Sequence, residues 1–171
     1  PMNYAALRYF NVAGADPAGR AGQSTAGATH LIKIAAEAAT GKRAHVSVFG
    51  TDYDTPDGTG VRDYIHVSDL ADAHVAALEK LIADPETSHI MNAGYSRGFS
   101  VNEVLDAVDR VTNMKIDRRM EPRRAGDPDA LISDNRAIVS RFGWQPKHDD
   151  LDKIVRDALA WERQLGERSK S

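Results

Sequence analysis

Arginines beside glycine-containing turns are the residues whose type and spacing most clearly suggest chemistry. Arg62 follows Gly58-Thr59-Gly60, where small residues let the backbone approach a ligand closely. A second run, residues 123–127 (Arg-Arg-Ala-Gly-Asp), has two arginines, Arg123 and Arg124, that lead into a turn. Two such loops can converge on a diphosphate, because guanidinium groups match the geometry of phosphate oxygens. The alternative is that these arginines form surface ion pairs with nearby aspartates, namely Asp63, Asp127 or Asp129.

Other kinds of catalytic or metal site find little support in the residue types. The chain has no cysteine, so thiolate metal sites and cysteine nucleophiles are excluded. His66 and Asp69 lie three residues apart, but no third ligand is spaced to complete a metal site. A Gly-x-Ser-x-Gly nucleophile elbow is also absent from the sequence. We therefore predict no metal site, and spacing alone predicts an anion pocket without a reaction.

The elements that must position the arginines alternate between strands and helices. Short apolar runs predict strands over residues 5–11, 46–49, 89–92 and 115–121, and a further short strand follows Arg62. Helical periodicity predicts helices capped by Thr29, Ser100 and Asp134, a helix that begins at Ser68, and an amphipathic final helix from Leu151. Ser100 and Glu103 have the spacing of a capping box. This alternation predicts an α/β fold, in which Asn11, at the end of the first strand, is a third candidate ligand contact.

The composition is that of a soluble globular protein. The 171 residues are 42% hydrophobic and 27% charged, with a net charge of −3. This balance predicts neither a nucleic-acid partner nor a membrane partner, and we expect a cytoplasmic protein because no signal peptide is visible. A Gly-x-Gly-x-x-Gly dinucleotide fingerprint does not occur in the sequence.

Several runs are similar to one known family. The chain resembles the C-terminal half of the UDP-glucose 4-epimerases, members of the extended short-chain dehydrogenase/reductase family. The runs that carry the resemblance are residues 7–11 (Leu-Arg-Tyr-Phe-Asn), 48–53 (Val-Phe-Gly-Thr-Asp-Tyr), 57–67 (Asp-Gly-Thr-Gly-Val-Arg-Asp-Tyr-Ile-His-Val), 69–71 (Asp-Leu-Ala) and 123–127.

The resemblance implies a fold, an activity and a cofactor. The expected fold is the C-terminal part of a Rossmann-like NAD-binding sheet plus the small α/β substrate-binding domain. Residues 1–171 would form a single C-terminal portion, without the half that carries the glycine fingerprint. The implied activity is an isomerase reaction, the NAD-dependent interconversion of UDP-glucose and UDP-galactose through a 4-keto intermediate. The complete enzyme is expected to be a homodimer.

The resemblance also implies roles for individual residues. Phe10 is expected near the nicotinamide, and Asn11 at the UDP-sugar. The uridine site is expected at Ser47, Val48 and Phe49, the diphosphate at Arg62 and Arg124, and a nucleoside contact at Asp127. Two positions depart from the family pattern. Thr29-His30-Leu31 replaces an Asn-Asn-Leu run at the sugar nucleotide, and Leu131 replaces the tyrosine or cysteine that sets sugar size in some relatives.

The family's catalytic Tyr-x-x-x-Lys pair does not occur in this sequence. Without that pair the chain lacks a general base for the sugar hydroxyl, so we expect no turnover by this chain alone. Three alternatives to the glucose epimerase remain: a 4-epimerase of a UDP-pentose or UDP-uronate, a non-catalytic UDP-sugar-binding fragment, and a structural fragment that pairs with another copy.

Overall fold

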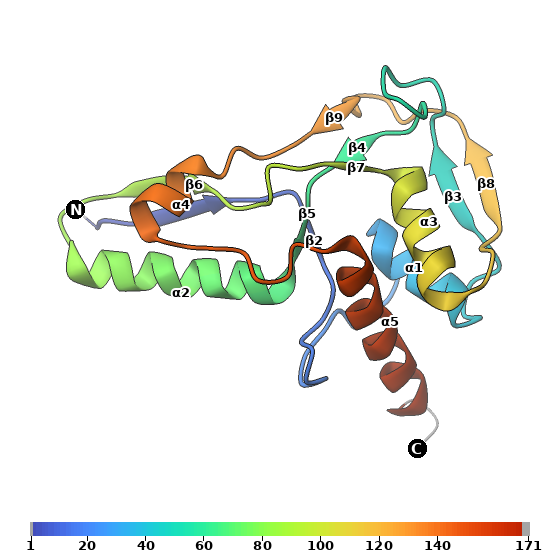
Figure 1. Ribbon diagram of the computed structural model, residues 1–171, viewed down its shortest axis with the longest axis horizontal. Helices are drawn as coiled ribbons and strands as arrows, with labels where there is room; N and C mark the ends of the chain where they lie inside the picture. Colours follow the sequence, from blue (N-terminus) through green and yellow to red (C-terminus); the bar gives the residue numbers. More distant parts are fainter. Residues whose placement is uncertain (1, 169–171) are drawn as a thin grey trace.

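The computed structural model describes residues 2–168, which form an α/β fold with short strands and five helices (Figure 1). The elements in chain order are β1 (Ala5–Arg8), β2 (Asn11–Ala13), α1 (Leu31–Ala39), β3 (Val46–Phe49), β4 (Val61–Arg62), β5 (Tyr64–His66), α2 (Val67–Ala83), β6 (His89–Asn92), β7 (Phe99–Ser100), α3 (Val101–Thr112), β8 (Arg118–Glu121), β9 (Ala130–Leu131), α4 (Arg136–Phe142) and α5 (Leu151–Arg168).

The strands pair mostly in parallel and between segments that are far apart in sequence. β1 pairs with β6, β2 with β5, and β3 with β8, all in parallel. β4 lies between β7 and β9, antiparallel to the first and parallel to the second. Parallel neighbours require crossover connections, which the helices provide. The predicted α/β class is therefore confirmed.

The core lies where α1, α3 and α5 face one another beside β3 (Figure 1). Each helix contributes apolar residues at helical spacing. These include Ile32, Ala35 and Ala36 of α1, Val104, Leu105 and Val108 of α3, and Ile154, Val155 and Leu159 of α5, all buried. This packing fixes α1 and β3, the two elements that border the pocket described below.

The predicted strand over residues 5–11 is two strands. Tyr9 and Phe10 interrupt the pairing, so β1 pairs with β6 and β2 pairs with β5. The strand expected over residues 115–121 begins only at Arg118. The residues before it are held differently, because the Asp109 carboxylate accepts from the Ile116 N–H at 2.9 Å and from the Lys115 ammonium at 3.2 Å.

Helix starts follow tertiary contacts as well as local residue type. The capping box of Ser100 and Glu103 at α3 is confirmed. The predicted start of α2 at Ser68 is one residue too late, since α2 begins at Val67. His66 is the N-cap, and its Nδ1 accepts from the Ser68 N–H at 3.0 Å. The N-caps of α1 and α4 each lie one residue after the predicted residue. His30 is the N-cap of α1 in place of Thr29, and Asn135 is the N-cap of α4 in place of Asp134.

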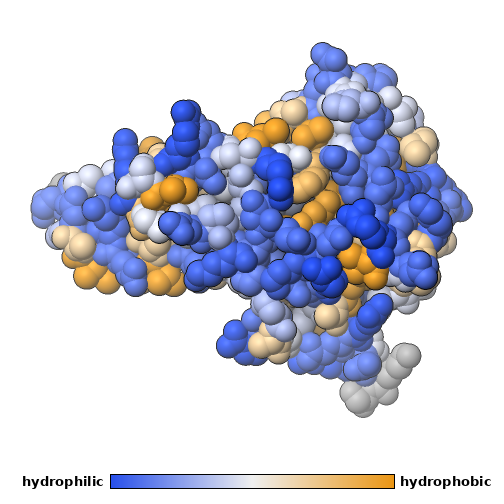
Figure 2. Space-filling model, in the orientation of Figure 1, coloured by the Kyte–Doolittle hydropathy of each residue, from blue (hydrophilic) through white to orange (hydrophobic). Residues whose placement is uncertain are grey.

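Helix α2 exposes apolar side chains on the side turned away from the core. Val75, Leu78 and Ile82 are 55%, 59% and 72% exposed, respectively, and Figure 2 shows apolar surface along the lower left edge, where α2 lies. Helix α2 therefore carries apolar side chains that do not pack inside this chain. No helix within residues 2–168 combines the length and apolarity needed to cross a membrane.

Candidate functional site

A cavity of about 640 Å³ lies between β3, the start of α1, the β4–β5 segment and the loop after β8. Eight of the residues expected at a UDP-sugar site line it: Asn11, His30, Leu31, Ser47, Phe49, Arg62, Arg124 and Asp127. Three expected residues do not line it: Phe10, Val48 and Leu131. The fold thus brings together most of a residue set drawn from five separate stretches of sequence.

Strand β3 presents one face and one edge to the cavity. The side chains of Ser47 and Phe49 face the cavity, whereas Val48 is fully buried in the core, as the twofold alternation of a strand requires. The N–H groups of Val46 and Gly50 donate to the β8 side, to Asp117 O at 2.8 Å and Glu121 O at 2.9 Å. Main-chain groups alternate between the two edges of a strand, so those of Ser47 and Phe49 point to the other edge. Within residues 2–168 that edge has no strand neighbour.

Arg62 is held between two loops by its own guanidinium. Its Nη1 donates to Val61 O at 2.8 Å and to Pro128 O at 3.0 Å. Its Nη2 lies 3.9 Å from the Asp127 carboxylate, a long ion pair. Gly60 lies against this group, because a Cβ there would be 3.4 Å from Nη1. The guanidinium is therefore positioned in advance, with N–H groups left for an anion.

The neighbouring arginines Arg123 and Arg124 separate into two roles. Arg124 stacks on the Phe49 ring, with its guanidinium carbon 3.8 Å from the ring centre, and lines the cavity. None of the salt bridges found in residues 2–168 includes Arg124. Arg123 instead pairs with Asp129 at 2.5 Å and lies over Tyr53. Arg123 therefore forms a surface ion pair, as the alternative interpretation expects, whereas Arg62 and Arg124 both line the cavity.

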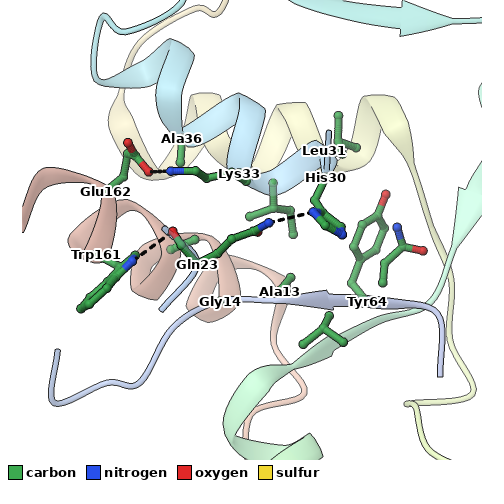
Figure 3. A pocket seen from close by; sticks show the side chains of 14 residues that line it. Ala13, Gly14, Gln23, His30, Leu31, Lys33, Ala36, Tyr64, Trp161 and Glu162 are labelled. Atoms are coloured by element: carbon green, nitrogen blue, oxygen red, sulfur yellow. Dashed lines mark hydrogen bonds and ion pairs between the residues drawn. The ribbon is translucent and has the colours of Figure 1, made fainter. Parts of the chain in front are cut away.

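The start of α1 is fixed from behind by α5 (Figure 3). The Gln23 amide nitrogen donates to His30 Nδ1 at 2.8 Å, and Trp161 Nε1 donates to Gln23 O at 3.1 Å. An amide nitrogen can only donate, so Nδ1 accepts and the His30 proton lies on Nε2. The buried ion pair of Lys33 and Glu162 joins the same two helices. These contacts determine where His30 sits in the cavity wall.

Asn11 and Tyr64 are register partners in the β2–β5 pair and line the cavity together. The Tyr64 side chain is buried. Burial raises the pKa of the Tyr64 phenol, so the hydroxyl stays neutral at physiological pH. Phe10 precedes Asn11 and is 44% exposed, with its ring outside the cavity. Leu131 is the register partner of Arg62 in β9.

The carboxylates of Asp63 and Asp69 hold neighbouring segments of the chain together through hydrogen bonds. Asp63 is buried and accepts from the N–H groups of Tyr95 and Ser133 and from the Ser133 hydroxyl, the last at 2.6 Å. Gly94 is required nearby, because a Cβ there would lie 2.6 Å from the Asp63 carboxylate and 2.0 Å from Ser133 Oγ. Asp69 accepts from the Tyr95 hydroxyl at 2.6 Å and from two main-chain N–H groups.

Sequence reasoning missed some residues of the cavity wall. His45, Arg43 and Val101 line the cavity but were not among the candidates. His45 could have been found from alternation, because it lies two residues before Ser47 on the same face of the strand. Val101 could not, since only the antiparallel pairing of β7 with β4 brings the start of α3 to this position.

Phe10 is the residue expected beside a nicotinamide ring. The exposed Phe10 ring fits a contact with a flat heteroaromatic ring, at the point where β1 ends. A glycine-rich phosphate cradle is absent from the sequence.

Comparison with known proteins places these observations in a family. A UDP-glucose 4-epimerase of Azospirillum brasilense is 57% identical over 159 residues, which cover 93% of this chain and 45% of the relative. A crystal structure of the Stenotrophomonas maltophila UDP-glucose 4-epimerase, with bound NAD and formylated UDP-arabinopyranose, matches with a TM-score of 0.92 and 40% identity over 97% of this chain and 49% of that chain. The Bifidobacterium longum enzyme, in complex with NAD+ and UDP, matches with a TM-score of 0.90 and 38% identity, covering 96% of this chain and 48% of that one.

The chain spans about half the length of the curated relatives it matches. The family model described as NAD dependent epimerase/dehydratase matches residues 1–94, which include β1, β2, the cavity-lining strand β3 and Arg62. On this evidence the chain belongs to the NAD dependent epimerase/dehydratase family.

Proposed function

We propose that this chain is the UDP-sugar-binding portion of a UDP-glucose 4-epimerase. One observation carries the proposal: Arg62 and Arg124, 62 residues apart in sequence, both face the same cavity, and Phe49 supports the second. Relatives named UDP-glucose 4-epimerase match nearly all of this chain. Two guanidinium groups beside an aromatic ring suit a nucleoside diphosphate better than a neutral sugar, because they can form charged hydrogen bonds with phosphate oxygens.

The diphosphate is assigned to Arg62 and Arg124. Arg62 is only 16% exposed along its side chain, so a charged hydrogen bond to phosphate is less screened there than at the surface. Its fixed position lowers the entropic cost of binding. Asp127 lies beside Arg62 and is assigned to a hydroxyl of the nucleoside, because a carboxylate would repel phosphate.

The uridine is assigned to β3. The unpaired edge at Ser47 and Phe49 presents alternating N–H and C=O groups, which complement the donor and acceptor groups of a pyrimidine. Val48 contributes indirectly, because its buried side chain anchors the strand in the core. The Phe49 ring adds apolar surface beside the base.

The sugar is assigned to Asn11, His30, Leu31 and Tyr64, which border the cavity near the start of α1. Asn11 and the Nε2–H of His30 supply hydrogen bonds to hydroxyl groups. Leu131 is the register partner of Arg62 in β9, does not line the cavity and has no polar side-chain group for a sugar. The same polar set accepts other hexose or pentose hydroxyls, so a UDP-pentose or UDP-uronate is the second candidate substrate.

The redox chemistry belongs to NAD, which accepts and returns a hydride when bound. This chain's part is to hold and orient the UDP-sugar, with Phe10 beside the cofactor. The relatives are about twice as long as this chain. We assign the general base and the remaining cofactor contacts to the half of the relatives that this chain does not match. The exposed apolar side chains of α2 support this assignment, because an apolar surface of this kind is typical of a site that another part of a protein covers.

Titration calorimetry with UDP tests the proposal. Binding of UDP by the purified chain, and no binding to an Arg62→Ala/Arg124→Ala variant, is the expected result. No heat of binding at millimolar UDP would leave only a structural fragment. A coupled assay with UDP-galactose and NAD is expected to show no turnover by this chain alone, and measurable turnover would overturn the assignment of the catalytic groups to other sequence.

A further inference from the structure

His45 is a polar residue of the cavity wall to which none of the roles above applies. Its side chain lies on the same face of the chain as those of Ser47 and Phe49, and all three line the cavity of about 640 Å³. Its Nδ1 is buried without a hydrogen-bond partner, and no hydrogen bond found in residues 2–168 includes the imidazole. Nε2 also makes no hydrogen bond within those residues and is not buried, so it is the His45 nitrogen that a ligand in the cavity can reach.

The other histidines of the described chain differ from His45 in one of two respects. His30, His66 and His74 each have a ring nitrogen in a hydrogen bond. His89 and His148 also have a buried nitrogen without a partner, but each packs against another ring. His89 meets Phe142 edge to face, and His148 stacks on His66, so both rings have a packing role outside the cavity. His45 has a free imidazole together with a place in the cavity.

The position of His45 relative to the arginines indicates which part of a ligand it meets. Arg124 lies over Phe49, so the charged end of a nucleoside diphosphate belongs at that end of β3. His45 lies four residues earlier, about 13 Å along an extended chain. The ligand group farthest from the diphosphate on the nucleoside side is the base. The free strand edge at Ser47 lies between the two ends.

We infer that His45 hydrogen-bonds the edge of the pyrimidine base and so contributes to the choice of nucleotide. This inference rests on the proposed UDP-sugar site and extends it. No internal hydrogen bond fixes the tautomer of the imidazole, so a ring nitrogen can carry the proton that a uracil carbonyl accepts. This side-chain hydrogen bond adds to those that the main-chain groups of β3 make with the base.

Three variants of the full chain separate this role from packing. His45→Phe keeps an aromatic ring and removes both nitrogens, whereas His45→Gln keeps a side chain that can donate. His74→Phe is the matched control, because His74 is an exposed histidine of α2 outside the cavity. Thermal unfolding of each variant checks that the fold is intact.

The binding probes are UDP, measured by calorimetry, and ribose 5-phosphate, measured by displacement of UDP. His45→Phe is expected to weaken UDP about 3- to 10-fold, the loss of one hydrogen bond, and to leave ribose 5-phosphate unchanged. His45→Gln is expected to recover most of the UDP affinity, and His74→Phe to match the parent chain.

Two results would overturn the inference while leaving the proposed function in place. One is UDP affinity unchanged in His45→Phe, and the other is an equal loss for UDP and ribose 5-phosphate, which would place the contact at the sugar or phosphate. If the parent chain binds no UDP, the proposed function fails, and the inference fails with it.

Discussion

Arg62 and Asp63 are adjacent in sequence, yet their side chains serve opposite purposes. The Arg62 guanidinium faces the cavity, where it contacts the main-chain oxygens of Val61 and Pro128. The Asp63 carboxylate is 2% exposed and binds the N–H groups of the Tyr95 and Ser133 segments. Substitutions at the two positions should therefore separate ligand binding from stability.

Replacing Arg62 should weaken the nucleotide without unfolding the chain. Arg62→Ala is expected to weaken UDP binding by about 1.5–3 kcal/mol, since hydrogen bonds to charged groups contribute that much. The variant also loses the hydrogen bonds to Val61 O and Pro128 O, so the free energy of unfolding should fall by about 0.5–1.5 kcal/mol, which is too little to unfold the chain. Calorimetry with UDP and urea unfolding measure the two quantities.

Arg123→Ala is the matched control for Arg62→Ala. Arg123 pairs with Asp129 and is absent from the cavity wall, so its removal should leave UDP affinity unchanged. Equal losses in the two variants would indicate a general effect of positive charge, and the assignment of Arg62 to the diphosphate would have to be given up.

Replacing Asp63 should have the reverse effect. Asp63→Asn puts an amide NH₂ group among buried N–H and O–H donors, so some donors lose their acceptor. The expected cost is about 1–3 kcal/mol for each buried donor left unsatisfied. Urea unfolding measures it, with Asp127→Asn as the control, because the Asp127 side chain is 41% exposed. Equal stability of the two variants would show that the Asp63 network is dispensable.

The stack of Arg124 on Phe49 should matter for affinity by positioning the arginine. Phe49→Leu keeps an apolar side chain but removes the ring under the guanidinium, which lies 3.8 Å from the ring centre. An exposed cation–π contact contributes about 0.5–1 kcal/mol, so UDP binding should weaken by about that amount. Calorimetry at constant ionic strength measures the change.

Phe99→Leu provides the comparison for Phe49→Leu, because Arg97 lies over Phe99 in a similar contact outside the cavity. This control should bind UDP like the parent chain. A larger loss in Phe99→Leu than in Phe49→Leu would argue against a role for the stacked Arg124 in binding.

The class of fold and eight residues of the cavity wall were predicted for identifiable reasons. Alternating strands and helices indicated α/β, and the capping box at Ser100 is a local pattern that tertiary structure left unchanged. The convergence of Arg62 and Arg124 followed from family resemblance. Spacing alone could not distinguish them from Arg123, since two adjacent arginines carry no local signal of which one pairs with Asp129.

Other features depended on contacts between distant segments. The start of α2 moved to His66 because its ring is fixed from both sides: Nδ1 accepts from the Ser68 N–H, and Nε2 bonds Asp157 of α5 at 3.1 Å. Side chains of β3 alternate between the core and the cavity, so Val48 and its neighbours must point in opposite directions. Which of them points to the core could be known only from the structure, where Val48 is buried. The exposed face of α2 shows that an apolar helical stripe can be wider than the core it meets.

The buried His66 makes the stability of the chain depend on pH. Burial, followed by the nearby His148, lowers the pKa of His66 below its ordinary value of 6.5. The unfolded chain then binds a proton more readily than the folded chain does. Stability from this group is therefore fully present above about pH 6.5 and falls as the pH drops from there toward the lowered folded pKa.

His66→Asn should flatten this pH dependence, because it removes the titrating ring while keeping an acceptor suited to the N-cap of α2. Urea unfolding between pH 5.5 and about 7.5 measures the slope. The His74→Asn control, at an exposed position on the same helix, should retain the slope of the parent chain. If His66→Asn loses stability on acidification as steeply as the parent chain does, the dependence arises from another group, and the buried His66 imidazole is already accommodated in its charged form by Asp157.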